Sequence, residues 1–167
     1  QGEVVNFIAI ESEITERRLI DEEQRRLAAI VGSSDDAIIS KNLDGIITSW
    51  NPAAEKIFGY SAEETIGQPM AMLVPPERAD EEPKILAKLR QGEKVDHFET
   101  VRVRKDGGLI DVSVSISPIQ GRDGSIIGAS KIARDITERN RQQKALEQSL
   151  ELLEIVQKTQ LRFIREQ

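Results

Sequence analysis

The chain contains no cysteine, so it can form neither a disulfide nor a thiolate metal site, and it offers no thiol nucleophile. Its single histidine, His97, falls in a strand-like segment, where we expect it to face solvent; the alternative is a ligand or a proton sensor. No pairing of a nucleophile with a base and no metal-ligand cluster is evident in the sequence. We therefore do not expect an enzyme or a metal site.

Long hydrophobic runs and basic clusters are also missing. No stretch approaches the roughly 18 apolar residues of a membrane helix, and no signal peptide is visible. The net charge is −6, whereas a nucleic-acid-binding surface needs clustered lysine and arginine. We expect a cytoplasmic protein that contacts neither membrane nor nucleic acid through this segment.

What is present fits one domain with helical extensions. A length of 167 residues is too short for two full domains, and 31% charged residues suggest long solvated helices. The residues from Ile14 to Val31 are free of proline and glycine and predict a connecting helix that stops at Gly32.

The first half of the domain reads as a hairpin followed by helices. The runs "AIISKN" and "IITSW" flank the turn residues Asp44-Gly45. Asn51 before Pro52 and Ser61 three residues before Glu64 predict the starts of two short helices. A longer helix is predicted within residues 77–92, with Pro83 marking a kink or a late start.

The second half alternates between apolar and polar residues and predicts three antiparallel strands with turns at residues 106–108 and 123–124. Five strands with helices on one face make an α+β sandwich. Its other face would contact the flanking helices or a second subunit.

A repeat links the beginning of the chain to the end of the domain. With an offset of 122 residues, "GEVVNFIAIESEITERR" matches "GSIIGASKIARDITERN" at six of seventeen positions. We interpret residues 1–17 as the last strand and exit motif of a preceding domain of the same kind. Residues 18–32 would then be a linker helix. The alternative is that two unrelated strand-to-helix junctions converged.

The segments "SWNPAAEKIFGYSAEETIG", "HFETVRVRKDG" and "GASKIARDITER", in this order, resemble the PAS sensory domains of bacterial signalling proteins. The resemblance implies a PAS domain at residues 33–137, an antiparallel sheet of strand order 2-1-5-4-3, and a small cavity between sheet and helices. It also implies a host such as a sensor histidine kinase or a cyclic-dinucleotide enzyme. Residues 1–17 are further similar to the last strand of light-oxygen-voltage domains.

The resemblance assigns signal coupling to the exit motif Asp135, Ile136 and Thr137, with a copy that contains Glu13 and Thr15. An Asp or Thr oxygen there can accept hydrogen bonds from the first amides of a helix, stabilising it by about 0.5–2 kcal/mol. A simple helix cap without a signalling role is the alternative. The resemblance also implies a structural pair between Glu55 and Lys105.

The cofactor stays open. A cysteinyl-flavin adduct is excluded because cysteine is absent, and heme is not expected because the helix within residues 77–92 has no histidine. Non-covalent flavin, a small apolar or carboxylate ligand, and an empty core remain as alternatives. The candidate pocket residues are Ile39, Trp50, Phe58 and Ile116.

Residues 138–167 predict a parallel coiled coil, and therefore a homodimer. The segment lacks glycine and proline, and its apolar stripe comprises Leu146, Leu150, Leu153 and Val156. A solitary helix is the alternative. Two functions follow: a ligand sensor that relays its state through the exit motif to a linked output domain, or a ligand-free constitutive dimerisation spacer.

Overall fold

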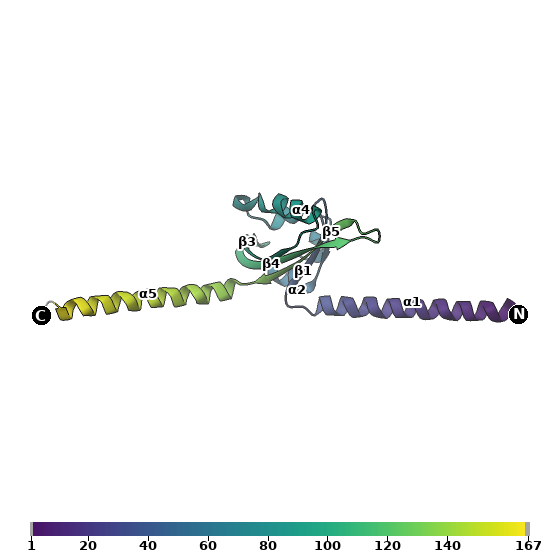
Figure 1. The fold of residues 1–167 in the computed structure, drawn as a ribbon, viewed down its shortest axis with the longest axis horizontal. Coiled ribbons are helices and arrows are strands. Elements are labelled where there is room, and N and C mark those ends of the chain that lie inside the picture. Colours follow the sequence, from purple (N-terminus) through teal and green to yellow (C-terminus); the bar gives the residue numbers. More distant parts are fainter. Residues whose placement is uncertain (1, 166–167) are drawn as a thin grey trace.

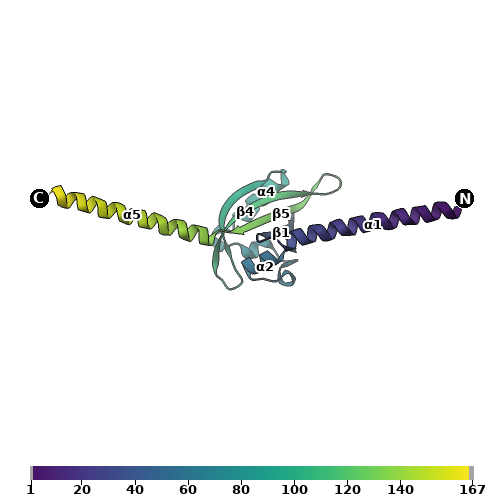
Figure 2. The same ribbon diagram turned by 90° about the horizontal axis from the view of Figure 1, so that it is seen from below.

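Two long helices project in opposite directions from a central body (Figure 1). They are α1 (Gly2–Gly32) and α5 (Thr137–Arg165), and a second view shows the same arrangement (Figure 2). This computed structural model describes the backbone of residues 2–165 and the side chains of residues 13–160. The last two residues of the predicted coiled coil lie outside this part.

The body is built on one antiparallel sheet whose strand order is β2-β1-β5-β4-β3, as predicted. β5 occupies the centre, between β1 and β4. The strands are β1 (Ala37–Asn42), β2 (Ile47–Trp50), β3 (Val95–Val103), β4 (Leu109–Gln120) and β5 (Ile126–Asp135).

The short helices begin where the capping residues predicted them. Asn51 Oδ1 accepts the Ala54 amide at 3.0 Å and starts α2 (Pro52–Phe58). Ser61 and Glu64 form a reciprocal capping box at α3 (Ala62–Thr65). Two 3₁₀ turns follow, at Met70–Leu73 and Pro76–Arg78.

The longer helix α4 (Glu81–Arg90) starts late and is shorter than its predicted segment. Pro83 lies in the first turn of α4, where backbone amides have no acceptor within the helix. The missing N–H of proline therefore costs no helical hydrogen bond at this position. Proline therefore marks a late start here and not a kink.

One face of the sheet packs against the short helices. Along β4, Ile110, Val112, Val114 and Ile116 are buried, while the intervening residues are only half-buried. This alternation follows from the two-residue period of a strand. The inward side chains form the core with residues from α2 and α4, including Phe58 and Leu89. Both long helices extend away from the body instead of covering the outer face (Figures 1 and 2).

The strand predicted within residues 1–17 is wrong, because residues 2–17 belong to the continuous helix α1. A β-strand needs a neighbouring strand for its backbone hydrogen bonds, whereas a helix satisfies its own. None of the described strands pairs with residues 2–17, and these residues continue the charged helix that follows. A preceding domain of the same kind stays a prediction.

Gly128 is the position where the central sheet leaves no room for a side chain. It lies opposite Asn42 on β1, and a Cβ atom built on it would be 2.4 Å from the Lys41 carbonyl oxygen. A contact this short can be relieved only by moving the backbone of β1 away from β5.

We expect Gly128→Ala to lower the free energy of unfolding by about 1–3 kcal/mol, because the added methyl group separates β1 from β5. Gly32→Ala is the control, since a Cβ atom there meets no heavy atom within 4 Å. Urea denaturation of both variants measures the difference. Equal stability of the two variants would contradict the close approach of β1 to β5.

Candidate functional site

The exit motif joins the central strand to α5. Asp135 Oδ1 accepts the Thr137 amide at 2.9 Å, which confirms the predicted cap. The Thr137 hydroxyl instead accepts the Asp111 amide of β4 at 3.1 Å, so it bonds to the sheet and not to the helix. Ile136 is 4% exposed and donates its amide to the Asp111 carbonyl at 2.9 Å. The motif therefore ties α5 to β4 as well as capping it.

Further residues, which the sequence analysis missed, extend this connection. The Asp111 carboxylate accepts a hydrogen bond from the Asn140 side chain at 3.1 Å, one turn into α5. Arg139 forms an ion pair with Glu99 of β3 at 2.6 Å, with both side chains about half exposed. Asp111 thus contacts Ile136 through its carbonyl, and α5 through its amide and its side chain.

The copy of the motif near the start of the chain has a different setting. Glu13 and Thr15 lie in the middle of α1, and not at the end of a strand. Glu13 pairs with Arg17 at 3.1 Å, one helical turn away, and both side chains are exposed. An exposed pair of this kind stabilises a helix by only about 0.3–0.5 kcal/mol.

The predicted pair between Glu55 and Lys105 is wrong. Lys105 forms its ion pair with Glu64 of α3, and its ammonium group lies 5.8 Å from the centre of the Tyr60 ring. Glu55 Oε1 accepts the Ala62 amide at 2.8 Å. The capping box fixes Glu64 close to Lys105, while Glu55 accepts a hydrogen bond from the first amide of α3.

The buried side chain of Asn51 connects α1 to the body. The Asn51 amide group donates to the carbonyls of Val31, at the end of α1, and of Asp36. Its Oδ1 accepts the amides of Ile38 and of α2. Asn51 is 4% exposed, so these bonds are shielded from water. The residue therefore holds α1, β1 and α2 together.

An ion pair joins the beginning of β1 to the end of β5. Arg134 donates from Nε and Nη2 to the two carboxylate oxygens of Asp36, at 2.9 and 2.7 Å. These hydrogen bonds lower the pKa of Asp36, despite the opposing effect of burial. Arg134 immediately precedes Asp135, so both ends of the domain meet beside the exit motif.

The predicted pocket residues all lie in the packed core. Ile39, Phe58 and Ile116 are 0% exposed. The Trp50 ring lies 5.5 Å from that of Phe58 and donates its N–H to the Tyr60 carbonyl at 3.1 Å. None of these four lines the pocket described next, so their role in ligand binding stays a prediction.

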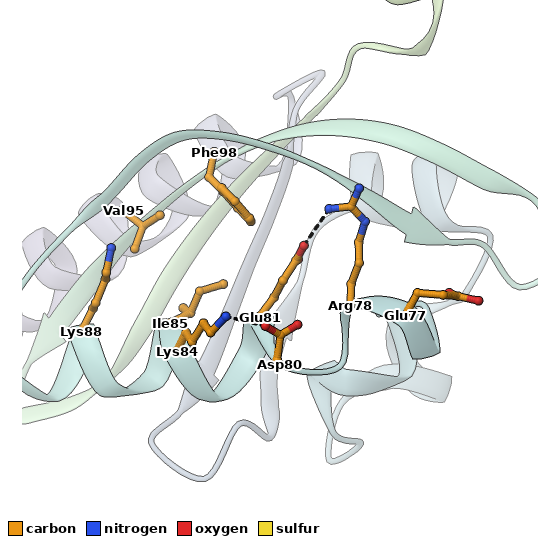
Figure 3. Close-up of a pocket in the computed structure, with 9 residues that line it drawn as sticks. All are labelled: Glu77, Arg78, Asp80, Glu81, Lys84, Ile85, Lys88, Val95 and Phe98. Carbon is orange, nitrogen blue, oxygen red and sulfur yellow. Dashed lines mark hydrogen bonds and ion pairs between the residues drawn. The ribbon is translucent and has the colours of Figure 1, made fainter.

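A pocket of about 590 Å³ opens between α4 and β3 (Figure 3). Val95 and Phe98 reach into it from β3, and the residues of α4 face them. Val95 is opposite Ile116 and Phe98 is opposite Val114, so β3 carries an extra residue between them. His97 adopts a φ of 48° in this bulge and is exposed, as predicted. The full lining is Glu77, Arg78, Asp80, Glu81, Lys84, Ile85, Lys88, Val95 and Phe98.

Glu81 forms the inner side of this pocket and belongs to a buried charged cluster. Its carboxylate accepts hydrogen bonds from Arg78 at 3.0 Å, Arg102 at 2.8 Å and Thr100 at 2.8 Å. Burial alone would raise the pKa of Glu81, but these hydrogen bonds together lower it. A deeper ion pair joins Lys41 of β1 to Glu82 of α4.

Lys131 of β5 is the most isolated member of the cluster. It is 1% exposed, and its Nζ has no hydrogen-bond partner within the described part of the chain. Burial and the neighbouring Arg102 lower the pKa of Lys131 to about 7, an effect that Glu82 only partly offsets. The sequence analysis missed Lys131, Lys41 and Arg102, although each alternates in step with buried neighbours.

The chain belongs to the PAS family, because residues 25–136 match the family described as PAS fold. Solved PAS domains agree with this assignment. One from Colwellia psychrerythraea is 34% identical, with a TM-score of 0.63, and the match covers 69% of this chain and 98% of that one. One from a protein of Haloarcula marismortui is 26% identical, with a TM-score of 0.64 and coverages of 74% and 99%.

Curated relatives are multidomain signalling proteins. The chain is 28% identical to the probable diguanylate cyclase DgcE of Escherichia coli, over 89% of this chain and 14% of the relative. It is 32% identical to the histidine-protein kinase AtoS of the same organism, over 72% of this chain and 19% of the relative. The chain thus spans less than a fifth of either protein and matches a PAS sensory module.

No described helix combines the length and apolar character needed to cross a membrane.

The lowered pKa of Lys131 predicts a pH dependence of stability. Unfolding restores the ordinary pKa of 10.5, so between pH 7 and pH 10 the unfolded chain binds more protons than the folded one. The free energy of unfolding should therefore rise with pH in this window, by up to about 1.4 kcal/mol per pH unit.

Lys131→Met should remove this contribution, because methionine fills a similar volume without a charge. Urea denaturation of the wild type and the variant at several pH values measures the difference between their slopes. Lys84→Met, at an exposed lysine of α4, is the control. Parallel slopes for the wild type and Lys131→Met would show that Lys131 titrates normally.

Proposed function

We propose that the chain is a sensor and dimerisation module of a cytoplasmic, multidomain bacterial signalling protein. It relays a change in the PAS core, or in a preceding domain, through Asp135, Ile136 and Thr137 into α5. The output domain would be a histidine kinase or a cyclic-dinucleotide enzyme, as in the relatives AtoS and DgcE. The observation that carries this proposal is the threefold contact of Asp111 with Ile136 and the start of α5.

The route of the relay follows from strand pairing. β3 and β4 both contact the start of α5, through Glu99 and Asp111, and β3 also lines the pocket beside α4. A displacement of β3 relative to β4 would change the position of the first turn of α5 and thus the direction of the helix. Such a switch needs two arrangements that differ by a small free energy.

Dimerisation would occur through the apolar stripe of α5. Leu146, Leu150, Leu153 and Val156 are 45–62% exposed in the single chain, although they recur on one side of the helix. A parallel coiled coil with a second copy would remove them from water. The two output domains would then lie side by side, at the end of a shared stalk.

A ligand-free constitutive spacer is the second candidate. It is favoured by the complete burial of Ile39, Phe58 and Ile116, which leaves no space beside these residues for a large cofactor. In this case signals would pass from α1 to α5 through the sheet, between Asn51 and Asp135.

The dimer can be tested with one substitution in the stripe and one outside it. Leu153→Asp should weaken self-association at least tenfold, because it places a carboxylate in the apolar interface. Ile155→Asp is the control: Ile155 is also 60% exposed, but two residues correspond to about 200° around the helix. Sedimentation equilibrium gives both dissociation constants. A monomeric wild type, or equal losses in the two variants, would contradict the proposed interface.

The relay can be tested with a spin label, since the absence of cysteine permits a single label at Ser149→Cys on α5. In the dimer, Thr137→Val should broaden or shift the distance distribution between labels, because it removes the hydrogen bond to the Asp111 amide. Thr159→Val is the control, as the Thr159 hydroxyl bonds only within α5. An unchanged distribution in Thr137→Val would refute a coupling role for this contact.

A further inference from the structure

Arg78 lines two separate hollows of the domain. It lies in the 3₁₀ turn Pro76–Arg78, shortly before α4. One hollow is the pocket of about 590 Å³ beside α4. The other has a volume of about 160 Å³, and its remaining lining is Glu99, Thr100, Val101, Asp111, Ile136 and Asn140. Several of these residues hold the start of α5, so one guanidinium group borders both the pocket and the exit of the chain.

In the structure, the guanidinium group is held by Glu81. Arg78 Nη1 donates to Glu81 Oε1 at 3.0 Å and to the Thr100 hydroxyl at 3.4 Å (Figure 3 shows the bond to Glu81). Nε and Nη2 of Arg78 donate to none of the residues that the structure describes. The Arg78 side chain is 43% exposed, so burial does not fix it in this position.

Glu81 keeps other partners if Arg78 leaves it. Its carboxylate also accepts hydrogen bonds from Arg102 at 2.8 Å and from the Thr100 hydroxyl at 2.8 Å. Arg102 is buried and stays beside Glu81. The charge of Glu81 therefore remains compensated without Arg78, which avoids the cost of an unpaired buried carboxylate.

Two carboxylates line the smaller hollow, and each has a free oxygen. Asp111 accepts the Asn140 side chain at Oδ2. Glu99 accepts Arg139 at Oε1. Within the described chain, no side chain donates to the second oxygen of either carboxylate. Hydrogen bonds between a guanidinium group and a carboxylate are about twice as strong as those of a neutral amide, so Arg78 can displace Asn140 from Asp111.

We propose that Arg78 is a positioning residue for α5 and has two alternative partners. Paired with Glu81, it leaves Asp111 to hold Asn140 in the first turns of α5. Turned into the smaller hollow, it binds Asp111, displaces Asn140 and loosens the start of α5. Both arrangements keep Glu81 and Asp111 hydrogen-bonded, so they differ by a small free energy, as a switch requires. This role rests on the proposed relay through the exit motif and assigns a residue that controls it.

The test measures the direction of α5 relative to the body within one chain. Two spin labels are placed at Lys56→Cys on α2 and Ser149→Cys on α5, both at exposed positions. Double electron–electron resonance gives the distances between them. An excess of the unlabelled chain, which has no cysteine, limits the measured distances to those within single chains of a dimer.

The proposal predicts that Glu81 acts on α5 through Arg78. Glu81→Gln should raise the population of displaced distances by about threefold, because a neutral amide holds Arg78 less firmly. The double variant Glu81→Gln/Arg78→Gln should return to the wild-type distribution, because no guanidinium group remains to bind Asp111. Glu81→Gln/Arg78→Lys should keep part of the displaced population, since an ammonium group can also pair with Asp111.

Glu77→Gln is the matched control and should leave the distribution unchanged. Glu77 lines the same pocket, but the guanidinium group of Arg78 bonds to Glu81 and not to Glu77. Circular dichroism establishes that each variant is folded. If Glu81→Gln does not fold, Arg78→Gln alone decides: it should narrow the wild-type distribution, and an unchanged width would overturn the proposal.

A merely structural role of Glu81 gives a different result. Displaced distances that persist in the double variant would overturn the proposal, because Glu81→Gln would then act without Arg78. An unchanged distribution in folded Glu81→Gln would overturn it as well. Thr137→Val separates this failure from that of the relay. Displacement in Thr137→Val alone would refute the role of Arg78 and leave the relay in place, whereas no displacement in either variant would refute both.

Discussion

The central place of β5 in the sheet is the constraint on which the other features depend. Because β5 lies between β1 and β4, the first strand of the domain and the strand that precedes the exit are direct neighbours. The Asp36–Arg134 pair, the buried Lys131 and the start of α5 all follow from this pairing. Gly128 permits the close approach of β1 that the arrangement requires.

The interior combines an apolar core with a charged cluster on one face of the sheet, and α4 contributes residues to both. Residues near α2 pack Trp50 and Phe58 against inward aliphatic side chains, whereas those near α4 surround Lys41, Arg102 and Lys131 with two glutamates. Charged groups buried in this way add little net stability, since desolvation offsets their attraction.

Local patterns predicted the strands, the turns and the helix starts, because strand alternation and capping residues act over a few positions. Asn51 and Ser61 were identified in this way, whereas Asp135 was identified through the family resemblance. The partner of Lys105 was not, since the choice between Glu55 and Glu64 depends on how α3 lies beside the β3–β4 turn. The inward lysines could have been found: Lys41 alternates with Ala37 and Ile39, and Lys131 with Ala129 and Ala133. A prediction of buried positions from hydrophobicity alone leaves such lysines out.

The opposite directions of α1 and α5 have a consequence for assembly (Figure 1). A domain that receives its chain at one end and releases it at the other can be joined in series, with each exit helix serving as the entry helix of the next unit. Adding or removing a unit lengthens such an array without changing any interface within the units. A displacement in one unit would then be transmitted through the shared helices to the next unit, and any unit could receive the signal.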